Sequence, residues 1–259
     1  MKLNLSVDVA ADYSSSSQRI RVMTEYWVNR SVFCPNCGNR LRQFDNNSPV
    51  ADFFCEICFE EYELKSKNGE IGKKVVDGAY ATMIERLNSD NNPNFFFLSY
   101  DKSTFAIRNF LTIPKYFFVP DIIERRKALS VTARRAGWVG CNIVMTNVPE
   151  FGKIFYVQNG IVKSKNEVLD KWSKTEFVKS TRDIESKGWI LDVLLCVERI
   201  KKEEFTLDEV YAFESYLQAK HPLNNNVKPK IRQQLQFLRD RGLIEFVGRG
   251  RYRMTTIGK

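Results

Sequence analysis

Three residues in the first quarter of the chain have the chemical groups needed to hydrolyse a phosphodiester bond. Asp52 is followed by Glu63 and Lys65, which lie in the alternating stretch YELKSK at 62–67. Such alternation predicts a strand, in which Glu63 and Lys65 point to one face and their neighbours to the other. The two carboxylates and the backbone carbonyl of Leu64 offer the oxygen ligands that Mg²⁺ prefers. Lys65 would then lie beside the metal, where its ammonium could orient or activate a water.

The Glu-x-Lys pattern has a simpler alternative, because the same residues are common on the solvated face of a strand. The preceding stretch PVAD at 49–52 and the basic chain around it favour the catalytic interpretation. Glu25, in the first predicted helix, could add a carboxylate, although the surface of that helix is the simpler place for it.

Four cysteines flank the aspartate with the spacing C-x2-C-x17-C-x2-C, which is typical of a structural zinc site. They are Cys34, Cys37, Cys55 and Cys58. Four thiolates fill the tetrahedral shell of Zn²⁺ and leave no open position, so we expect a structural metal that clamps the loop ending in Asp52. Cys141 and Cys196 have no such partners and are expected to be small core residues.

Apolar periodicity predicts the elements that must position these side chains. Two helices are expected in the first half of the chain, one over 14–30 and one that Asp77 caps. Strands are expected at 62–67, 95–100, 105–114 and 153–162. The fold class that follows is α/β (α+β).

The last third of the chain has the pattern of a winged-helix domain. Helices are expected over about 183–200 and about 206–220, then a basic helix over 227–242 and a hairpin. Residues 220–259 contain ten Lys or Arg against two Asp or Glu, which favours a polyanionic partner over a merely solvated basic helix. A recognition helix of this type enters the major groove, where Gln suits adenine and Arg suits guanine. The candidates to face DNA are Lys228, Lys230, Arg232, Gln233 and Gln236 on the helix and Arg249, Arg251 and Arg253 on the wing.

The whole chain of 259 residues carries a formal net charge of +9 and suits one large or two modest domains. We place the boundary so that 1–182 is the catalytic domain and 183–259 the DNA-binding domain. The longest apolar stretch, at 189–197, is too short for a membrane span, and the N-terminus has no apolar signal core. We expect a monomer in a reducing cytoplasm, where disulfides are rare.

Several long strings resemble DpnI-like, methyl-directed type II restriction endonucleases of the PD-(D/E)xK superfamily. They include CPNCGN, YELKSK, DGAYATM, DNNPNFFFL, TARRAGWVGCNI and IRQQLQFLRDRGLIEFVGRGRYR, and the resemblance runs from about 14 to about 254. It implies a PD-(D/E)xK core with an inserted zinc site, and cleavage of duplex DNA at GATC sites that carry N6-methyladenine. It also implies that Asp52 and Glu63 hold Mg²⁺ with Lys65 beside the water. The Pro-Asp of the superfamily is stretched here to PVAD.

Recognition of a methyl group demands more than one contact. A buried methyl contributes about 0.8 kcal/mol, or roughly a fourfold preference, so we expect both domains to recognise the methylated site. In the stretch TARRAGWVG, Arg134 and Arg135 could grip DNA while Trp138 offers an apolar surface. The residues alone favour a loop or core tryptophan, and it is the resemblance that implies the methyl contact.

Two other functions remain open from the sequence. A zinc-ribbon and winged-helix transcription regulator would have the same cysteines and basic helix, with Glu63 and Lys65 incidental. A repair or recombination nuclease could share the same core, and only the resemblance in the Trp138 segment argues against it.

Overall fold

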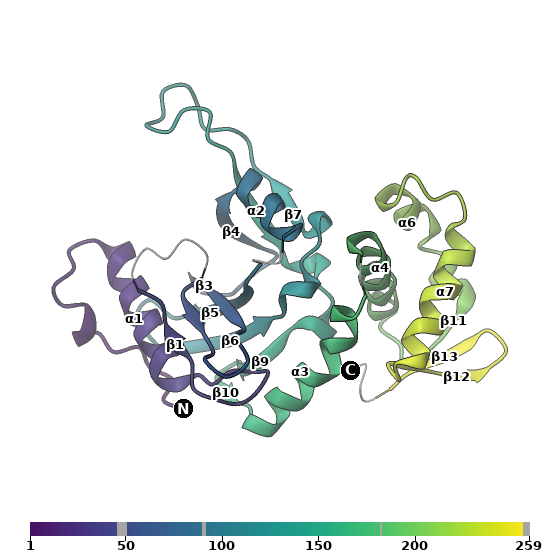
Figure 1. Cartoon of the computed structure of the whole chain (residues 1–259), viewed down its shortest axis with the longest axis horizontal. Coiled ribbons are helices and arrows are strands. Elements are labelled where there is room, and N and C mark those ends of the chain that lie inside the picture. The colour runs from purple at the N-terminus through teal and green to yellow at the C-terminus, as the bar shows by residue number, and fades with distance from the viewer. Residues whose placement is uncertain (46–50, 90–91, 182, 256–259) are drawn as a thin grey trace.

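The computed structural model describes residues 1–45, 51–89, 92–181 and 183–255 (Figure 1). Of the PVAD stretch, Ala51 and Asp52 are therefore described, whereas Pro49 and Val50 lie outside the described residues. None of the helices in these ranges is long and apolar enough to cross a membrane.

A mixed sheet of seven strands forms the centre of the N-terminal half. Its order is β1-β2-β3-β5-β6-β9-β10, and only β3 and β5 pair in parallel. The strands are β1 (Arg42–Gln43), β2 (Phe53–Phe54), β3 (Glu61–Asn68), β5 (Asn94–Tyr100), β6 (Ile107–Ile113), β9 (Ile154–Gln158) and β10 (Ile161–Val162). The strands expected around 62–67, 95–100 and 105–114 are thus confirmed with shifted ends, whereas the run expected over 153–162 is a hairpin of two strands, β9 and β10.

Helices α1 (Ser16–Ser31) and α3 (Lys165–Lys179) cover one face of this sheet. Trp27 of α1 and Trp172 of α3 are buried in one cluster with Tyr62 and Phe96 from the strands. The helix expected over 14–30 is therefore confirmed. The sequence patterns did not predict α3, which starts at a capping box formed by Ser164 and Glu167.

The opposite face of the sheet meets a second, three-stranded sheet and helix α2 (Tyr80–Leu87). The strand order is β4-β8-β7, with β4 (Lys74–Ala79), β7 (Ile123–Arg125) and β8 (Gly140–Val144). The prediction that Asp77 caps the helix is wrong. Asp77 lies inside β4 opposite Cys141, and the helix begins three residues later without a side-chain cap.

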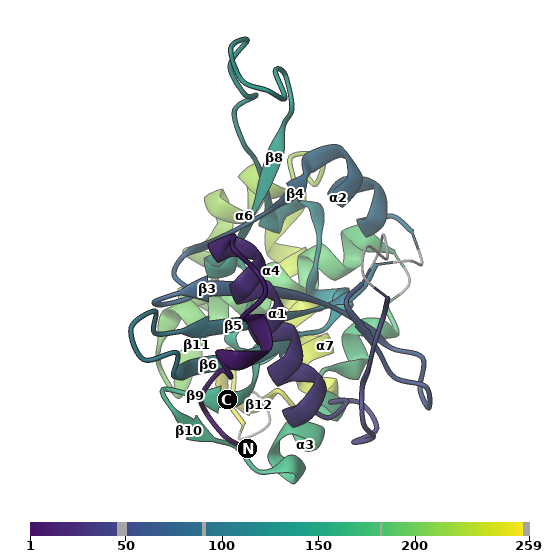
Figure 2. The ribbon, with the colours of Figure 1, turned by 90° about the vertical axis from the view of Figure 1, so that its left-hand side faces the viewer.

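The loop between β7 and β8, residues 126–139, projects from this second sheet, away from the rest of the molecule (Figures 1 and 2). Backbone hydrogen bonds continue the hairpin into it, from Arg126 N to Gly140 O (2.9 Å) and from Leu129 N to Trp138 O (2.9 Å). We call residues 126–139 the projecting loop.

The C-terminal part is a winged helix-turn-helix unit, as the sequence predicted. It contains α4 (Ile184–Ile200), β11 (Glu204–Thr206), α5 (Leu207–Tyr211), α6 (Glu214–Lys220), α7 (Val227–Asp240), β12 (Ile244–Gly248) and β13 (Arg251–Met254). The helix expected over 206–220 is divided in two at 212–213. Ile231, Leu235 and Leu238 of α7 are fully buried, as expected, and Gly242 after the helix has a positive φ of 73°.

One continuous apolar core joins the two parts of the chain. It includes Phe95 and Phe97 from the central sheet, Trp189 and Leu194 from α4, and Leu235 from α7. Helix α4 therefore packs against both the central sheet and α7. This contact joins the winged-helix unit to the sheet.

Candidate active site and zinc centre

The backbone brings Asp52 directly beside the Glu-x-Lys strand. β2 and β3 pair antiparallel with Phe53 opposite Tyr62, and the Asp52 amide donates to the Tyr62 carbonyl at 3.0 Å. The Asp52 side chain then accepts a hydrogen bond from the Leu64 amide, with 2.7 Å between Oδ2 and N. The carboxylate of Asp52 therefore rests against β3 between Glu63 and Lys65.

Glu63 and Lys65 share the face of β3 predicted from the alternation. Lys65 Nζ donates to Glu63 Oε1 at 2.5 Å and lies 5.8 Å from the centre of the Phe95 ring. Tyr62 and Leu64 belong to the cluster on the opposite face, with α1 and α3. Glu63 and Lys65 are thus in direct contact, and the carboxylate of Asp52 lies at the backbone of Leu64, the residue between them.

A carboxylate that the sequence analysis placed elsewhere completes this group. Asp77, on β4 of the second sheet, forms an ion pair with Lys65 Nζ, and its side chain is only 5% exposed. Lys65 therefore lies between the carboxylates of Glu63 and Asp77. In the structure Val75 and Asp77 are buried and alternate with exposed neighbours, so both point inward from β4. The sequence KVVDGA at 74–79 has no such polar and apolar alternation, because the exposed Val76 is apolar.

Burial and charge oppose each other in this group. Burial raises the pKa of Glu63, the ammonium of Lys65 counteracts that rise, and the charge of Asp77 adds to it. Burial alone would lower the pKa of Lys65, but the charges of Glu63 and Asp77 outweigh it and raise the pKa. Lys65 is therefore a cation at neutral pH, and this suits it to orient a water or to offset phosphate charge rather than to act as a neutral base.

Glu25 was expected on the surface of the first helix, but it is buried. Its residue exposure is 7%, because α1 presses it toward the sheet edge. There it is salt-bridged to Arg21 (2.6 Å) and accepts a hydrogen bond from Gln43 (3.0 Å). Burial raises the pKa of Glu25, Arg21 opposes this effect, and the charge of Asp52 contributes further to the rise. Glu25 therefore belongs to the electrostatic surroundings of Asp52.

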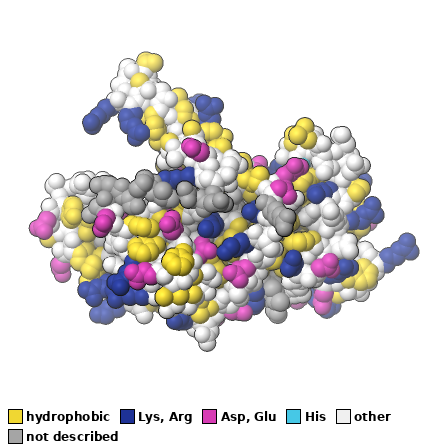
Figure 3. Space-filling view, in the orientation of Figure 1, with side chains coloured by type: hydrophobic (Ala, Val, Ile, Leu, Met, Phe, Trp, Pro, Cys, Tyr) yellow, Lys and Arg dark blue, Asp and Glu magenta, His cyan; other side chains and the backbone are white. Residues whose placement is uncertain are grey.

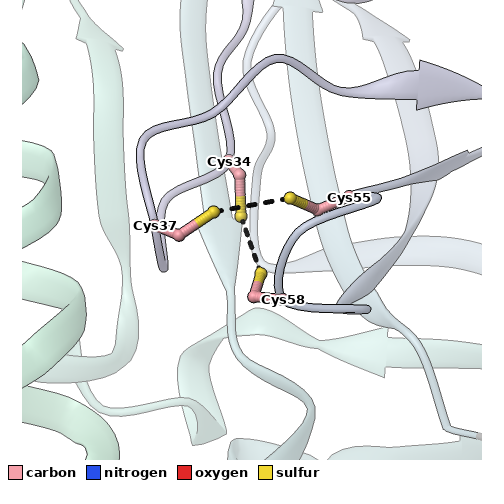
Figure 4. A group of neighbouring side chains, drawn as sticks. All are labelled: Cys34, Cys37, Cys55 and Cys58. Atoms are coloured by element: carbon pink, nitrogen blue, oxygen red, sulfur yellow. Dashed lines mark hydrogen bonds between the residues drawn. The ribbon is translucent and has the colours of Figure 1, made fainter.

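The four cysteines expected to bind zinc meet at one point (Figure 4). Their sulfur atoms all lie within 4.8 Å of one another, with Cys34 and Cys58 at 3.5 Å and Cys37 and Cys55 at 3.4 Å. Tetrahedral zinc with bonds of about 2.3 Å separates its sulfur ligands by about 3.8 Å, so the arrangement fits the ion. Burial raises the pKa of Cys58 to about 11, and four thiolates this close need a cation to compensate their charge.

The two cysteine turns have the same backbone geometry. Gly38 N donates to Cys34 O (2.8 Å), and Phe59 N donates to Cys55 O (2.9 Å). Both residues have positive φ, 73° at Gly38 and 59° at Phe59. A large side chain in the left-handed region is unusual, and Phe59 is also 80% exposed. The repeated turn points the sulfur atoms of both cysteine pairs at one place, as a tetrahedral metal site requires.

Two carboxylates and a backbone carbonyl beside β3 are the kind of ligand that a hard cation prefers. The atoms that would hold Mg²⁺ there are those of Asp52, Glu63 and the Leu64 carbonyl. In the part of the chain that is described, the four cysteines are the only group of three or more metal-binding side chains whose ligand atoms lie within 4.8 Å of one another, so the carboxylates beside β3 do not meet as closely as the four sulfurs do.

The projecting loop presents the aromatic and basic residues expected to contact DNA. The guanidinium of Arg135 lies 4.7 Å from the centre of the Trp138 ring, and Arg134 is exposed. The indole of Trp138 packs over Gly140, where an added Cβ would be 2.7 Å from two of its ring atoms. Figure 3 shows Lys and Arg side chains on this projection. The projecting loop therefore presents the half-exposed apolar ring of Trp138 together with the cationic side chains of Arg134 and Arg135.

The winged-helix residues expected to face DNA differ in their exposure and in whether they form ion pairs. Arg232, Gln233 and Gln236 are exposed on α7, and Lys230 is half-buried. Lys228 is exposed but pairs with Glu214 at 3.3 Å. On the wing, Arg251 and Arg253 both bind Glu204, whereas Arg249 is exposed and has no ion pair within the described ranges. The wing is therefore less cationic than its arginine count suggests.

Two family models match the chain. The one described as DpnI, the Dam-replacing family, covers residues 1–181, and the one described as DpnI_C, the Dam-replacing HTH domain, covers residues 185–254. The first match includes Asp52, Glu63, Lys65 and the four cysteines, and the second coincides with the winged helix.

Proposed function

The chain belongs to the Dam-replacing family of DpnI-like restriction endonucleases, and from this premise we propose that it is a Mg²⁺-dependent, methyl-directed type II enzyme. It cleaves double-stranded DNA at GATC sites that carry N6-methyladenine. Both its catalytic domain, 1–182, and its winged-helix domain, 183–259, recognise the methylated site. It acts as a monomer in the cytoplasm, with a structural zinc ion on the four cysteines.

The observation that supports the catalytic proposal is that Asp52 and the Glu63–Lys65 pair lie at the same stretch of β3. Asp52 is hydrogen-bonded to the backbone of Leu64 at 2.7 Å, and Glu63 and Lys65 are in contact at 2.5 Å. A DNA-binding regulator needs no such set. Two carboxylates and an ammonium beside one another are the groups that in-line hydrolysis of a phosphodiester uses.

Each group has a separate role in the proposed reaction. Asp52, Glu63 and the Leu64 carbonyl hold Mg²⁺, which when bound polarises the scissile phosphate and lowers the pKa of a water. The Lys65 ammonium orients the attacking water and offsets charge on the phosphate. Glu63 and Lys65 are mostly buried, at 20% and 17% side-chain exposure, so their electrostatic effects are stronger than they would be in bulk water.

Methyl recognition in this proposal depends on two surfaces. One methyl contributes roughly fourfold, and the methyls of both strands together about sixteenfold, if only apolar burial counts. A second surface that binds the same site independently multiplies the preference. The projecting loop supplies Trp138 with Arg134 and Arg135, and helix α7 supplies Arg232, Gln233 and Gln236.

The test is a digest of one plasmid prepared from adenine-methylating and non-methylating hosts, with and without Mg²⁺. We expect cleavage only of methylated plasmid and only with Mg²⁺. Glu63→Gln should abolish cleavage while keeping DNA affinity. If neither plasmid is cut, the enzyme proposal fails and a regulator is favoured. If both are cut equally, the proposed specificity fails.

A further inference from the structure

Among the described residues, Asp77 is the one carboxylate paired with Lys65 that comes from outside the central sheet. It lies on β4, twelve residues after Lys65 in the chain, and pairs in register with Cys141 of β8. Its side chain is 5% exposed, and its ion pair with Lys65 is a direct contact. Glu63, the other partner of Lys65, belongs to the proposed metal-binding set, whereas Asp77 does not.

This arrangement gives the two carboxylates different tasks. A glutamate that holds a cation can share less of its charge with a neighbouring ammonium. Lys65 then needs a second anchor to remain in place in a buried site, because a side chain with four rotatable bonds has many alternative rotamers. Asp77 is placed to be that anchor, since it approaches Lys65 from the second sheet. Glu63 is also paired with Arg86 at 3.5 Å, so its charge is already shared between two cations.

We infer that Asp77 is a positioning residue that holds the Lys65 ammonium in the cleavage site and ties it to the sheet that carries the projecting loop. This inference rests on the proposed function, because the role of Lys65 in cleavage is part of that proposal. Trp138 is three residues before Cys141, the partner of Asp77 in the β4–β8 ladder. The same strand pair therefore supports both Lys65 and the base of the loop.

The first experiment measures single-turnover cleavage of methylated GATC duplex by Asp77→Asn, with enzyme in excess of DNA and saturating Mg²⁺. We expect the rate to fall roughly 100-fold, as for a misplaced catalytic group. DNA affinity, measured without divalent metal, should stay within about twofold, because the change lies away from the DNA-contacting side chains. A wild-type rate, or an equal loss of rate and affinity, would overturn the inference.

Glu124→Gln is the matched control. Glu124 lies on β7 of the same sheet, where it pairs with Lys74 (2.5 Å) and accepts from Asn142 (2.7 Å), and it does not contact Lys65. Rate and affinity should both stay at the wild-type level. If Glu124→Gln slows cleavage as much as Asp77→Asn, the effect belongs to the sheet as a whole and Asp77 has no special role.

A second measurement does not depend on cleavage. Melting temperatures are taken without Mg²⁺ for Lys65→Met, Asp77→Asn and the double variant. If the two side chains act on each other, removing both relieves the buried charge that each single change leaves, and the double variant melts no lower than either single. Additive losses would overturn the inference, as would a double variant that does not fold.

The two proposals fail in different ways. A wild-type chain that cuts no DNA overturns the proposed function, and the inference about cleavage falls with it. A wild-type chain that cuts methylated DNA, together with an Asp77→Asn variant that cuts equally fast, overturns the inference alone.

Discussion

The indole ring of Trp138 packs against Gly140, which has no side chain. A Cβ at Gly140 would be 2.7 Å from two atoms of the indole, so Gly140→Ala must displace the ring. We predict that this variant loses preference for methylated over unmethylated DNA, by roughly the sixteenfold that methyl burial provides, and keeps its affinity for unmethylated DNA. Competition binding with the two duplexes measures this ratio.

Gly78→Ala is the control for that change, because Gly78 lies on the neighbouring strand and an added Cβ there meets nothing within 4 Å. It should behave as wild type. If Gly140→Ala keeps the methyl preference while Trp138→Ala loses it, the position of the ring matters less than its presence. If neither variant changes the preference, the projecting loop does not recognise the methyl group.

Glu60 gives a prediction about pH. It is 6% exposed, accepts from Asn94 at 2.9 Å and pairs with Lys115 and Lys179 at 3.4 Å. Burial alone would raise its pKa, but these three partners together lower it. A carboxylate with a lowered folded-state pKa stabilises the fold above its unfolded pKa of about 4.3, and that contribution is lost as the pH falls through the folded-state value.

We therefore predict that Glu60→Gln lowers the free energy of unfolding by about 1.5–3 kcal/mol at pH 7, as expected for a hydrogen-bonded buried charge. The difference from wild type should shrink as the pH falls below about 4. Urea titrations of both proteins at several pH values measure it. A difference that is independent of pH would mean that the loss comes from packing and not from the charge.

Single residues were placed correctly where their chemistry and the local periodicity of the sequence indicated the same structure. The alternation at 62–67 placed Glu63 and Lys65 on one face of β3, and the cysteine spacing identified four sulfurs that do meet. Asp77 and Glu25 were misplaced for one reason. Both are buried by elements distant in sequence, β8 and the sheet edge at Gln43, and a polar residue carries no local signal of such burial.

At the scale of elements, the cysteine segment brings together four sulfur atoms that could hold a metal ion. We predict one zinc per chain by elemental analysis. Cys58→Ser should lose the zinc, lower the melting temperature and abolish cleavage, because Asp52 precedes Cys55 by three residues and loses its position against β3. Cys141→Ser, at a buried cysteine outside the cluster, should keep the zinc. Wild-type protein without zinc, or full cleavage by Cys58→Ser, would contradict the prediction.

Helices and strands with a strong apolar periodicity were predictable from the sequence. Strands that depend on pairing with other strands were not. Helix α1, strands β3 and β5, and helix α7 with the wing followed from apolar spacing and capping residues. The three-stranded sheet β4-β8-β7 did not, since β7 has three residues and β4 is distant in the chain from its partner β8. Short strands draw their stability from neighbours, which a single sequence does not reveal.

At the scale of the whole molecule, the positive charge is less concentrated than the count suggests. Residues 220–259 have a surplus of eight, but Arg251 and Arg253 share the carboxylate of Glu204, which lies outside that range and offsets one of their two charges. Basic residues on the projecting loop, Arg134 and Arg135, add a second cationic region in the other half of the chain (Figure 3). Two separate cationic surfaces are consistent with a duplex held from two sides.

The two halves are also joined by a buried ionic contact. Lys220 of α6 pairs with Asp192 of α4 at 2.5 Å and with Asp121, which lies just before β7 in the catalytic half. Asp192 is 7% exposed and also contacts His221, at 2.9 Å from its Nε2, while the His221 ring stacks on Trp189 at 3.9 Å. Lys220 therefore connects the winged helix to the catalytic half through two carboxylates.

We predict that Lys220→Met lowers the free energy of unfolding by about 3–5 kcal/mol, because it leaves the charge of Asp192 buried without its ammonium partner. Lys202→Met is the control, since Lys202 pairs with Glu209 at 2.5 Å but is 61% exposed, and it should cost less than about 1 kcal/mol. Urea denaturation measures both. In the double variant Lys220→Met with Asp192→Asn, much of the stability should return, because no unpaired charge remains. Equal effects of the two lysine changes would show that the contact between the halves depends on the shared apolar core and not on this ion pair.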